Sequence, residues 1–328
     1  MKNRTCTRRE MLRQGGAALF LPALLPGEAA MASPQEGKST KGKSLAGAAG
    51  TVALAPDLVV NRMGFGAMRI LGVQEWGPPP DVAGAKKLLR RALDLGVDFI
   101  DTADAYGPNV SEELIADALY PYPAGLVIGT KGGIVRPSPP EWVADSSPKH
   151  LREACHGSLR RLRLDRIDLY QLHAVDDDVP LADSIGELAK LQREGKIRYI
   201  GVSNVTAGEL ALARSMVNVV SVQNRYNVVT RGSEELLGVC EREGIVFIPH
   251  TPLARRAQAT GTHKEKTDAL LRVAQQRGIS TAQAALAWLL TKSPAMLPIP
   301  GTSSIGHLEE NVAAAALRLT PQEMASIG

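Results

Sequence analysis

VDFIDTADAYG, residues 97–107, decides the fold more than any other stretch of the chain. Its apolar beginning is typical of a short buried strand, and its polar end delivers Asp101 and Tyr106 just after that strand. An amphipathic helical pattern, SEELIADAL, follows closely. A strand followed by a helix is the repeating unit of parallel α/β folds. The stretch therefore predicts one such unit, with polar groups at the carboxyl end of its strand.

The same strand–helix unit recurs to the end of the chain. Eight pairs can be counted, with the strand runs MGFGA, VDFID, LVIGT, IDLYQL, IRYIGV, VSVQN, IVFIP and MLPIP. Alternating strands and helices imply a parallel sheet, and eight pairs imply closure into a (β/α)8 TIM barrel. The preceding run TVALAPDLVV is interpreted as an N-terminal β-hairpin that caps the barrel floor. We therefore predict a single barrel domain over residues 51–328.

Two more polar residues stand at the ends of the next predicted strands. Lys131 ends LVIGTK, and His173 ends IDLYQLH. Each residue alone has an ordinary interpretation, such as a solvated lysine or a structural histidine. However, barrel active sites lie at the carboxyl ends of the strands, so these two are expected to meet Asp101 and Tyr106. An ammonium beside a phenol lowers the tyrosine pKa from its usual value of ~10, and a carboxylate balances the charge. That combination is suited to the reduction of a carbonyl group.

The residues around these four resemble the aldo-keto reductase family. The matching stretches, in the family's order and spacing, are MGFGAMR, GVDFIDTADAYG with SEEL, TKGG, DLYQLH, GKIRYIGVSN, VQNRYN and PIPGTSSIGHLEENV. The resemblance implies that Tyr106 is the proton donor in the reduction of small aldehydes or ketones. It also implies that Asp101 and Lys131 tune the tyrosine and that His173 orients the substrate carbonyl. The MRILG and WGPPP loops resemble a branch of the family that includes pyridoxal reductases.

Amide and hydroxyl side chains at later strand ends suit the carboxamide of a nicotinamide. Ser203, Asn204 and Gln223 supply such groups, and Asn and Gln carry both donors and acceptors. Alone, GVSN could cap the helix that begins at AGEL, but Gln223 at the next strand end favours the cofactor. The resemblance extends the expected cofactor site to Gly66, Met68, Pro252 and Leu253.

The last motif places a glycine–threonine turn before a helix start, and helix N-termini attract phosphate. His307 stands where the best-known family members carry arginine, and histidine is a weaker, pH-dependent cation. NADPH is the expected cofactor and NADH stays possible, although Arg255 and Arg256 could compensate for the missing charge. The residues expected at the adenosine end of the cofactor are Gly301, Thr302, His307, Glu310 and Asn311.

Aromatic residues near the predicted site have open or divided interpretations. His250 stands where many family members place a tyrosine or tryptophan that stacks on the nicotinamide, and Tyr226 is the alternative stacking residue. Trp76 and Trp142 lie in long Pro-rich loops on the catalytic side. We expect these two to wall a substrate pocket for a flat or apolar aldehyde.

Residues 1–32 have the layout of a signal peptide. Five basic residues precede the apolar run GGAALFLPALL, which is too short to span a membrane, and AMA offers an A-x-A cleavage pattern. TRREMLR, residues 7–13, resembles the twin-arginine motif, which implies export of the folded protein by the twin-arginine machinery to the periplasm. A disordered basic leader is the alternative. The following residues, 33–50, are small or basic and are predicted to form a flexible linker.

Composition narrows the remaining classes of function. Of the 38 basic and 34 acidic residues, five and two lie in residues 1–32, which leaves a nearly neutral remainder of 33 and 32. No dense basic stripe indicates nucleic acid binding, and no later run is long enough for a membrane span. Three cysteines without metal-type spacing indicate neither a metal site nor a disulfide framework. The two remaining interpretations are an NAD(P)H-dependent reductase and a cofactor-binding barrel that acts as a sensor or associated subunit.

Overall fold

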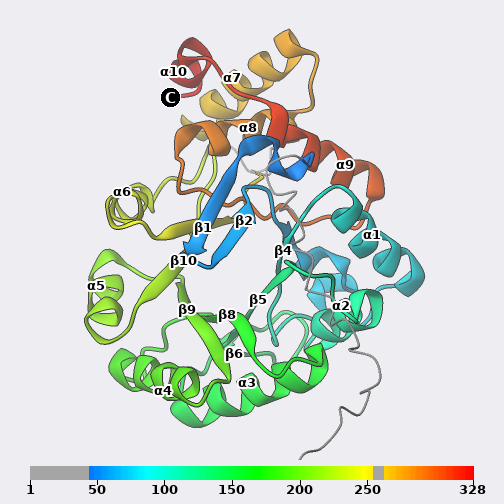
Figure 1. The fold of residues 1–328 in the computed structure, drawn as a ribbon. Coiled ribbons are helices and arrows are strands. Elements are labelled where there is room, and N and C mark those ends of the chain that lie inside the picture. Colours follow the sequence, from blue (N-terminus) through cyan, green and yellow to red (C-terminus); the bar gives the residue numbers. More distant parts are fainter. Residues whose placement is uncertain (1–43, 254–261) are drawn as a thin grey trace, which may run out of the picture. The chain divides into compact units, whose positions relative to one another are not determined.

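A seven-stranded parallel sheet forms the centre of the molecule, in a computed structural model that describes residues 44–253 and 262–328. Helices surround the sheet on its outer side (Figure 1). The strand order is β11-β10-β9-β8-β5-β4-β3, so the strands neighbour one another in chain order, as the barrel prediction requires. Their bounds are β3 Phe65–Gly66, β4 Phe99–Asp101, β5 Val127–Gly132, β8 Ile167–Leu172, β9 Ile197–Ser203, β10 Val219–Arg225 and β11 Val246–His250.

The segment 295–300 lies where an eighth strand was expected. The backbone N–H of Leu297 donates to the carbonyl of Phe247 in β11 at 2.9 Å. The N–H of Gly64, just before β3, donates to the carbonyl of Pro298 at 3.0 Å. The segment thus joins the two edges of the sheet. It is not a regular strand, because proline has no N–H to continue the ladder. The prediction of eight strands is corrected to seven strands and one extended segment.

The helices follow the strands in the expected alternation. Sequence-encoded caps fix several of their starts: Asp81 accepts from the N–H of Gly84, while Thr206 and Ser280 each begin a capping box. The bounds are α1 Val82–Asp94, α2 Val110–Leu119, α3 Pro148–Leu162, α4 Leu181–Arg193, α5 Ala207–Met216, α6 Glu234–Glu243, α7 Thr262–Arg277, α8 Thr281–Lys292, α9 Ile305–Ala313 and α10 Pro321–Ile327.

Alternation along the strands divides the buried apolar residues into two clusters. Phe99 and Leu169 belong to a small cluster with residues of neighbouring strands. Their chain neighbours Ile100 and Tyr170 belong to the large cluster that includes the helices. Successive side chains of a strand point to opposite faces, so the small cluster fills the barrel interior and the large one lies between strands and helices.

A two-stranded antiparallel sheet covers the amino-terminal end of the barrel. β1, Thr51–Ala55, pairs with β2, Leu58–Asn61. Leu54, Leu58 and Val60 are buried in the same cluster as Phe99 and Leu169. A hairpin of apolar residues thereby closes the floor. A second small sheet, β6 Ile134–Val135 with β7 Val143–Ala144, projects from the other end, after β5.

The expected linker, residues 33–50, ends earlier in the structure than the sequence predicts. Ala46–Ala49 form a 3-10 helix, η1, with Ala46 fully buried. The N–H of Ala46 donates to the carbonyl of Leu95 at 3.0 Å. Small side chains, which resemble those of a flexible linker, here allow close packing against the barrel. Residues 33–43 and the whole of the predicted signal peptide, residues 1–32, lie outside the described residues.

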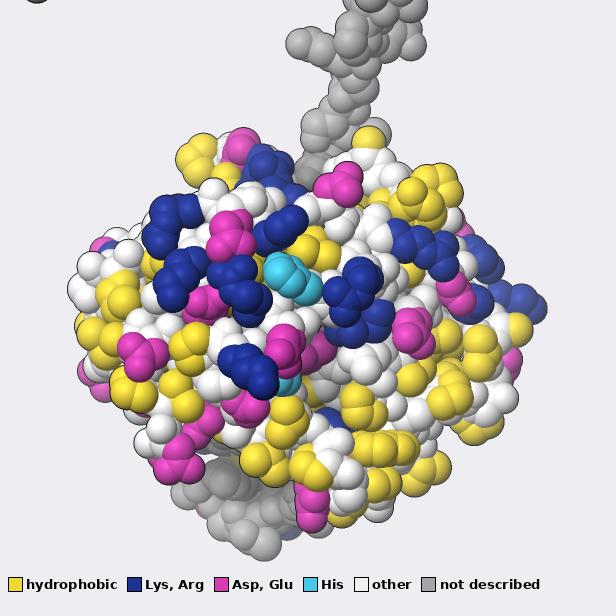
Figure 2. Space-filling view, turned by 90° about the horizontal axis from the view of Figure 1, so that it is seen from below, with side chains coloured by type: hydrophobic (Ala, Val, Ile, Leu, Met, Phe, Trp, Pro, Cys, Tyr) yellow, Lys and Arg dark blue, Asp and Glu magenta, His cyan; other side chains and the backbone are white. Residues whose placement is uncertain are grey.

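The outer surface carries mixed charge. Figure 2 shows the side of the barrel on which α3 and α4 lie, where Lys and Arg side chains gather with Asp and Glu among them. Several of these charges are paired: Arg152 of α3 bonds Glu187 at 2.6 Å and Glu194 at 2.8 Å. In residues 44–253 and 262–328, no helix is long and apolar enough to cross a bilayer.

Candidate active site at the carboxyl ends of the strands

A cavity of about 660 Å³ opens at the carboxyl ends of the strands. It brings together most of the predicted site residues: Gly66, Met68, Asp101, Tyr106, Trp142, His173, Ser203, Asn204, Gln223, Pro252, Leu253 and Gly301. The sequence analysis missed several further wall residues, which are Arg69, Glu75, Ile134, Thr251, Ile299 and Pro300. Arg69 and Glu75 lie in short 3-10 helices, Ile134 lies in β6, and the other three lie in loops, so this set comes together only in the fold.

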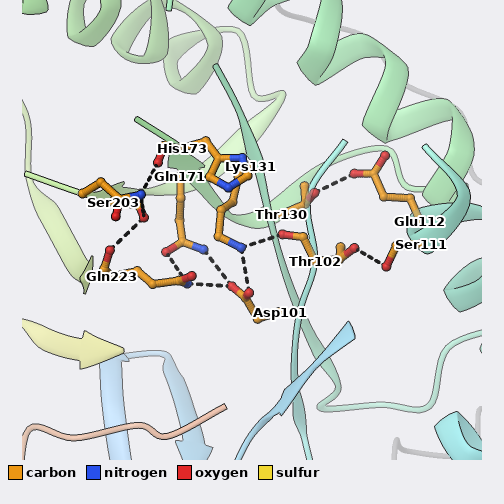
Figure 3. A network of polar contacts seen from close by, with 11 residues as sticks. Asp101, Thr102, Ser111, Glu112, Thr130, Lys131, Gln171, His173, Ser203 and Gln223 are labelled. Atoms are coloured by element: carbon orange, nitrogen blue, oxygen red, sulfur yellow. Dashed lines mark hydrogen bonds and ion pairs between the residues drawn. The ribbon is translucent and has the colours of Figure 1, made fainter. Parts of the chain in front are cut away.

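Lys131 and Asp101 form a buried ion pair beneath the cavity. Nζ of Lys131 lies 2.7 Å from Oδ2 of Asp101 and 2.8 Å from the carbonyl oxygen of Thr102. The side chains are 0% and 2% exposed. Burial opposes the charge of Lys131, but Asp101 and Tyr106 raise the lysine pKa above its usual value, so the ammonium persists. Figure 3 shows this pair at the centre of a polar network.

Two glutamines hold the other oxygen of the carboxylate. Nε2 of Gln223 donates to Oδ1 of Asp101 at 2.8 Å, and Nε2 of Gln171 donates to the same atom at 3.2 Å (Figure 3). Gln171 was not predicted. It stands two positions before His173, so strand alternation was a usable signal for its inward orientation. The two amides fix the orientation of the Asp101 carboxylate.

Tyr106 lies beside the lysine in a loop after β4. Its ring centroid is 5.1 Å from Nζ of Lys131 and 5.7 Å from the ring centroid of His173. Burial raises the pKa of Tyr106 above its usual value, although the Lys131 ammonium opposes this shift. The ammonium acts in the predicted direction, but desolvation of the phenol outweighs it, so the net shift of the tyrosine pKa is upward. A protonated phenol at neutral pH is the form that a proton donor requires.

His173 faces the cavity as a neutral imidazole. Burial, followed by the charge of Lys131, lowers its pKa well below the usual value. Its Nδ1 atom is buried and accepts or donates no hydrogen bond within the described part of the chain. A neutral ring can donate from one nitrogen to a substrate oxygen. The same wall holds His250, whose pKa burial lowers to about 4.

Ser203, Asn204 and Gln223 meet on one wall, as predicted for a nicotinamide site. Nδ2 of Asn204 donates to the carbonyl of His173 at 3.0 Å, and Oδ1 of Asn204 lies 3.0 Å from Nε2 of His250. Oγ of Ser203 donates to the backbone carbonyl of Gln223 at 2.7 Å. Nε2 of Gln223 bonds Asp101, whereas its Oε1 has no bonded donor in the residues the structure describes. Both N–H groups of Asn204 and of Gln223, and the Ser203 hydroxyl, are bonded within the protein, so the wall presents one free acceptor, Oε1 of Gln223, for the N–H of a carboxamide.

His250 and Tyr226 differ in their access to this wall. Tyr226 is fully buried in the core, stacked on Trp288 at 5.9 Å between centroids, and its hydroxyl donates to Glu234. The alternative that Tyr226 stacks on a nicotinamide is therefore wrong. Of the two candidates for stacking on a nicotinamide, His250 is the one that lines the cavity.

The backbones of Gly66, Ile299 and Gly301 pack closely together in another wall of the cavity. A Cβ on Gly66 would lie 2.7 Å from the carbonyl oxygen of Ile299, and one on Gly301 would lie 2.6 Å from that of Gly66. Only glycine allows this close approach. A second hollow of about 420 Å³ continues past Gly301 along Thr302 and Ser303. The two hollows share Met68, Arg69 and Gly301, and the second one reaches the residues just before α9. Together they suit the extended shape of a dinucleotide.

Three residues expected at the adenosine end do not line either hollow. His307 and Glu310 are exposed on α9, and Asn311 is only 3% exposed. Ser304 caps α9 by accepting from the N–H of His307 at 3.4 Å. Arg255 and Arg256, expected to compensate for the missing charge, lie outside the described residues.

The two loop tryptophans have different roles. Trp142 lines the cavity, with its ring centroid 6.1 Å from that of Tyr106 and 6.4 Å from that of His173. Trp76 does not line it. Both indoles contact the guanidinium of Arg136: its Cζ atom lies 3.7 Å from the ring centroid of Trp142 and 5.5 Å from that of Trp76. Sequence analysis did not single out Arg136, because nothing local marks a residue whose contacts lie in distant loops.

Known proteins offer a comparison for this geometry. The sequence profile of the aldo/keto reductase family matches residues 62–328. An uncharacterized oxidoreductase of Schizosaccharomyces pombe is 48% identical over 280 residues, covering 85% of this chain and 89% of that protein. Pyridoxine 4-dehydrogenase of Escherichia coli is 40% identical over 274 residues, covering 82% and 94%.

Solved structures show the same architecture. An aldo-keto reductase from Klebsiella pneumoniae in complex with NADPH superposes with a TM-score of 0.71 at 29% identity, covering 84% of this chain and 93% of that one. The glycerol dehydrogenase of Gluconobacter oxydans gives a TM-score of 0.75 at 27% identity, covering 85% and 94%.

Proposed function

Because the chain belongs to the aldo/keto reductase family, we propose that it reduces an aldehyde or ketone to the alcohol, with NADPH as the cofactor. The family match and the relatives named as oxidoreductases support an NAD(P)H-dependent oxidoreductase. The observation that carries the proposal is the buried Lys131–Asp101 pair beneath Tyr106, in a cavity with the carboxamide-compatible wall.

A bound reduced nicotinamide would supply the hydride. Ser203, Asn204 and Gln223 would hold its carboxamide, and the second hollow along Gly301, Thr302 and Ser303 would take the rest of the cofactor. Neighbouring structures in complex with NADP or NADPH support this choice of cofactor. NADH stays possible because position 307 is a histidine.

Tyr106 donates its proton to the substrate oxygen. The adjacent ammonium stabilises the phenolate that remains, and Asp101 fixes the ammonium in place. His173, neutral at physiological pH, orients the carbonyl by a hydrogen bond. A positioned proton donor contributes roughly a hundredfold to ten-thousandfold to the rate of such a step.

The substrate is a flat aromatic aldehyde of the pyridoxal type. Tyr106, Trp142 and His173 surround one end of the cavity with mutually edge-to-face rings, which suits a planar guest. The Escherichia coli relative is named for pyridoxine, the alcohol that corresponds to pyridoxal. Ile134 and Leu253 add apolar wall surface.

Steady-state turnover tests this function. Purified protein with NADPH and pyridoxal should consume both and release one alcohol for each cofactor oxidised. Fluorescence titration with NADPH in the same preparation measures cofactor binding independently of turnover. Cofactor binding without turnover of pyridoxal, benzaldehyde or propanal would instead favour the sensor or associated subunit.

The amino-terminal segment suggests a place of action. Arg8 and Arg9 stand in the twin-arginine-like motif, and on that motif the protein is exported folded, with its cofactor, and processed near Ser33. Replacing both arginines by lysine should leave an uncleaved precursor inside the cell. Recovery of uncleaved parent protein from the cytoplasm alone would reject export and leave the reductase proposal untouched.

A further inference from the structure

We propose that Arg136 is the positioning residue that holds two separate loops as the wall of the substrate end of the cavity, and so sets selectivity for flat aromatic substrates. The proposal rests on the function proposed above. Arg136 follows β6 and is 7% exposed. It does not line the cavity itself, so it acts through the residues that do.

The first loop is the turn at Gln74 and Glu75. The guanidinium of Arg136 donates to the carbonyl of Gln74 at 3.1 Å and to that of Glu75 at 3.4 Å. Both turn residues have left-handed backbone, with φ of 59° and 54°. Side chains other than glycine disfavour that conformation, so the turn needs outside support. Arg69 also supports the turn, with Nη1 2.8 Å from Oε1 of Glu75.

The second loop carries Trp142. The same guanidinium donates to the carbonyl of Pro139 and stacks on the Trp142 ring, with Cζ 3.7 Å from the centroid. Trp142 is still 39% exposed, because it lies at the cavity mouth. Cation–π contact and the bond to Pro139 therefore fix an indole that the core does not enclose. Glu75 and Trp142, on different loops, both line the cavity.

A planar guanidinium with several donors is needed for this combination. It reaches two carbonyls of one loop and one of the other while its face remains on an indole. A lysine keeps the charge but has neither the fork nor the stacking face. Arg136→Met keeps an apolar stem of similar reach and removes the charge, the donors and the stacking face together.

The kinetic experiment compares two substrates in the parent, Arg136→Met and Arg136→Lys. Arg136→Met should raise KM for pyridine-4-carbaldehyde about tenfold or more while kcat changes by less than about threefold, because loose walls bind the flat ring poorly. The kcat/KM for propanal, which needs no aromatic wall, should change by less than about threefold. The NADPH dissociation constant should not change, and Arg136→Lys should shift KM in the same direction.

A second readout does not depend on turnover. Acrylamide quenching of tryptophan fluorescence should increase in Arg136→Met, because Trp142 and Trp76 lose their contact. The increase should vanish in a Trp76→Phe, Trp142→Phe background, which leaves only Trp288, 1% exposed in the core. This measurement decides the loop-holding role even if the parent turns over no aldehyde, an outcome that would contradict the proposed function alone.

Arg198→Met is the matched control. Arg198 also stacks on an aromatic ring, with Cζ 5.3 Å from the Tyr199 centroid, and it bonds Asp168 at 3.3 Å and Asp57 in the hairpin turn. It lies at the floor of the barrel, so this variant should keep the parent KM, selectivity and quenching. Parent-like KM and quenching in a folded Arg136→Met, checked by circular dichroism, would overturn the proposal.

Discussion

The two ends of the barrel interior are built from the same strands but from opposite kinds of residue. Phe99 points into the floor cluster, and Asp101, two residues on, holds Lys131. Leu169 and Gln171 repeat the contrast in β8, two strands away from β4 in the sheet. The floor is sealed by an apolar hairpin, whereas the other end keeps ions and amides out of water around an open cavity. Within the barrel interior, apolar packing therefore lies at the floor, and the polar groups suited to chemistry lie at the cavity end.

The cavity end carries a cost that the floor does not. Lys131 and Asp101 are both removed from water, and a buried pair gains little net stability even when its geometry is good. Its retention is explained by what the ammonium does for Tyr106. Substitutions at the two ends should therefore separate stability from activity.

The largest expected effect is on the floor. Phe99→Ala removes a fully buried ring from the interior cluster and should lower the free energy of unfolding by about 3–5 kcal/mol. Urea denaturation measures the loss, and kcat of the remaining folded protein should stay within about threefold of the parent, since the ring touches no reacting group. A loss of activity without a loss of stability would break the division between the two ends.

Lys131→Met should act mainly at the cavity end. Without the ammonium, the rate of carbonyl reduction should fall about a hundredfold or more, because the phenolate loses its stabilising charge. The single variant should also lose stability, since Asp101 remains buried without its partner. Lys131→Met with Asp101→Asn should recover that stability in urea denaturation and stay inactive. Recovery of both properties in the double variant would contradict the role given to the pair.

Acid should weaken the cavity end through its histidines. His173 and His250 have lowered pKa values in the folded state, about 4 for His250. As pH falls below the unfolded value of ~6.5, the unfolded chain takes up protons that the folded chain does not, so stability falls. Each histidine contributes at most about 1.4 kcal/mol per pH unit. The free energy of unfolding of the parent minus that of His173→Asn should therefore fall from pH 7 to pH 5.

The difference between the two proteins is measured, and not the parent alone, because Asp104 opposes the loss of stability at acid pH. Burial raises the pKa of this carboxyl to about 8, so its folded form binds a proton that the unfolded form lacks between about pH 4 and pH 8. This contribution favours the folded state as pH falls through that window. Asp104 is common to parent and variant, and it cancels in the comparison. A pH-independent difference would show that His173 is not held neutral.

The smallest expected effect is at the adenosine end of the cofactor. His307→Arg introduces a permanent, bidentate cation on exposed α9 and should raise the preference for NADPH over NADH by about tenfold. Fluorescence titration of both cofactors measures the ratio. A parent preference of a thousandfold or more would show that other residues hold the phosphate.

Much of the fold could be predicted because the spacing of apolar residues marks the strands and helices, and polar residues directly after the strands mark the site. The apolar runs predicted β4, β5 and β8 closely, and placement at strand ends brought Asp101, Lys131 and His173 together. The eighth strand failed because its prolines cannot join a ladder, although they do not disturb the apolar pattern. The small residues 46–49 match the composition of a linker, and the sequence alone does not show that they pack against the barrel.

Residues that act across loops were the ones the sequence did not reveal. Arg136 has no local motif, and its partners are 61 or 62 positions away for one loop and only a few for the other. The burial of Tyr106 was also not evident from the sequence. It raises the pKa of the phenol, whereas the neighbouring charge alone would lower it. The sequence alone leaves Tyr226 as an alternative stacking residue for the nicotinamide, because it does not show that the ring packs on Trp288 in the core.

The most direct measurement is the rate of aldehyde reduction by Tyr106→Phe. The change keeps the ring that packs against His173 and Trp142 and removes only the hydroxyl. The cavity-end account predicts a loss of about a hundredfold or more in kcat with NADPH affinity unchanged, the scale expected for a general acid. Reduction of pyridoxal at near the parent rate by this variant would contradict the assignment of Tyr106 as proton donor.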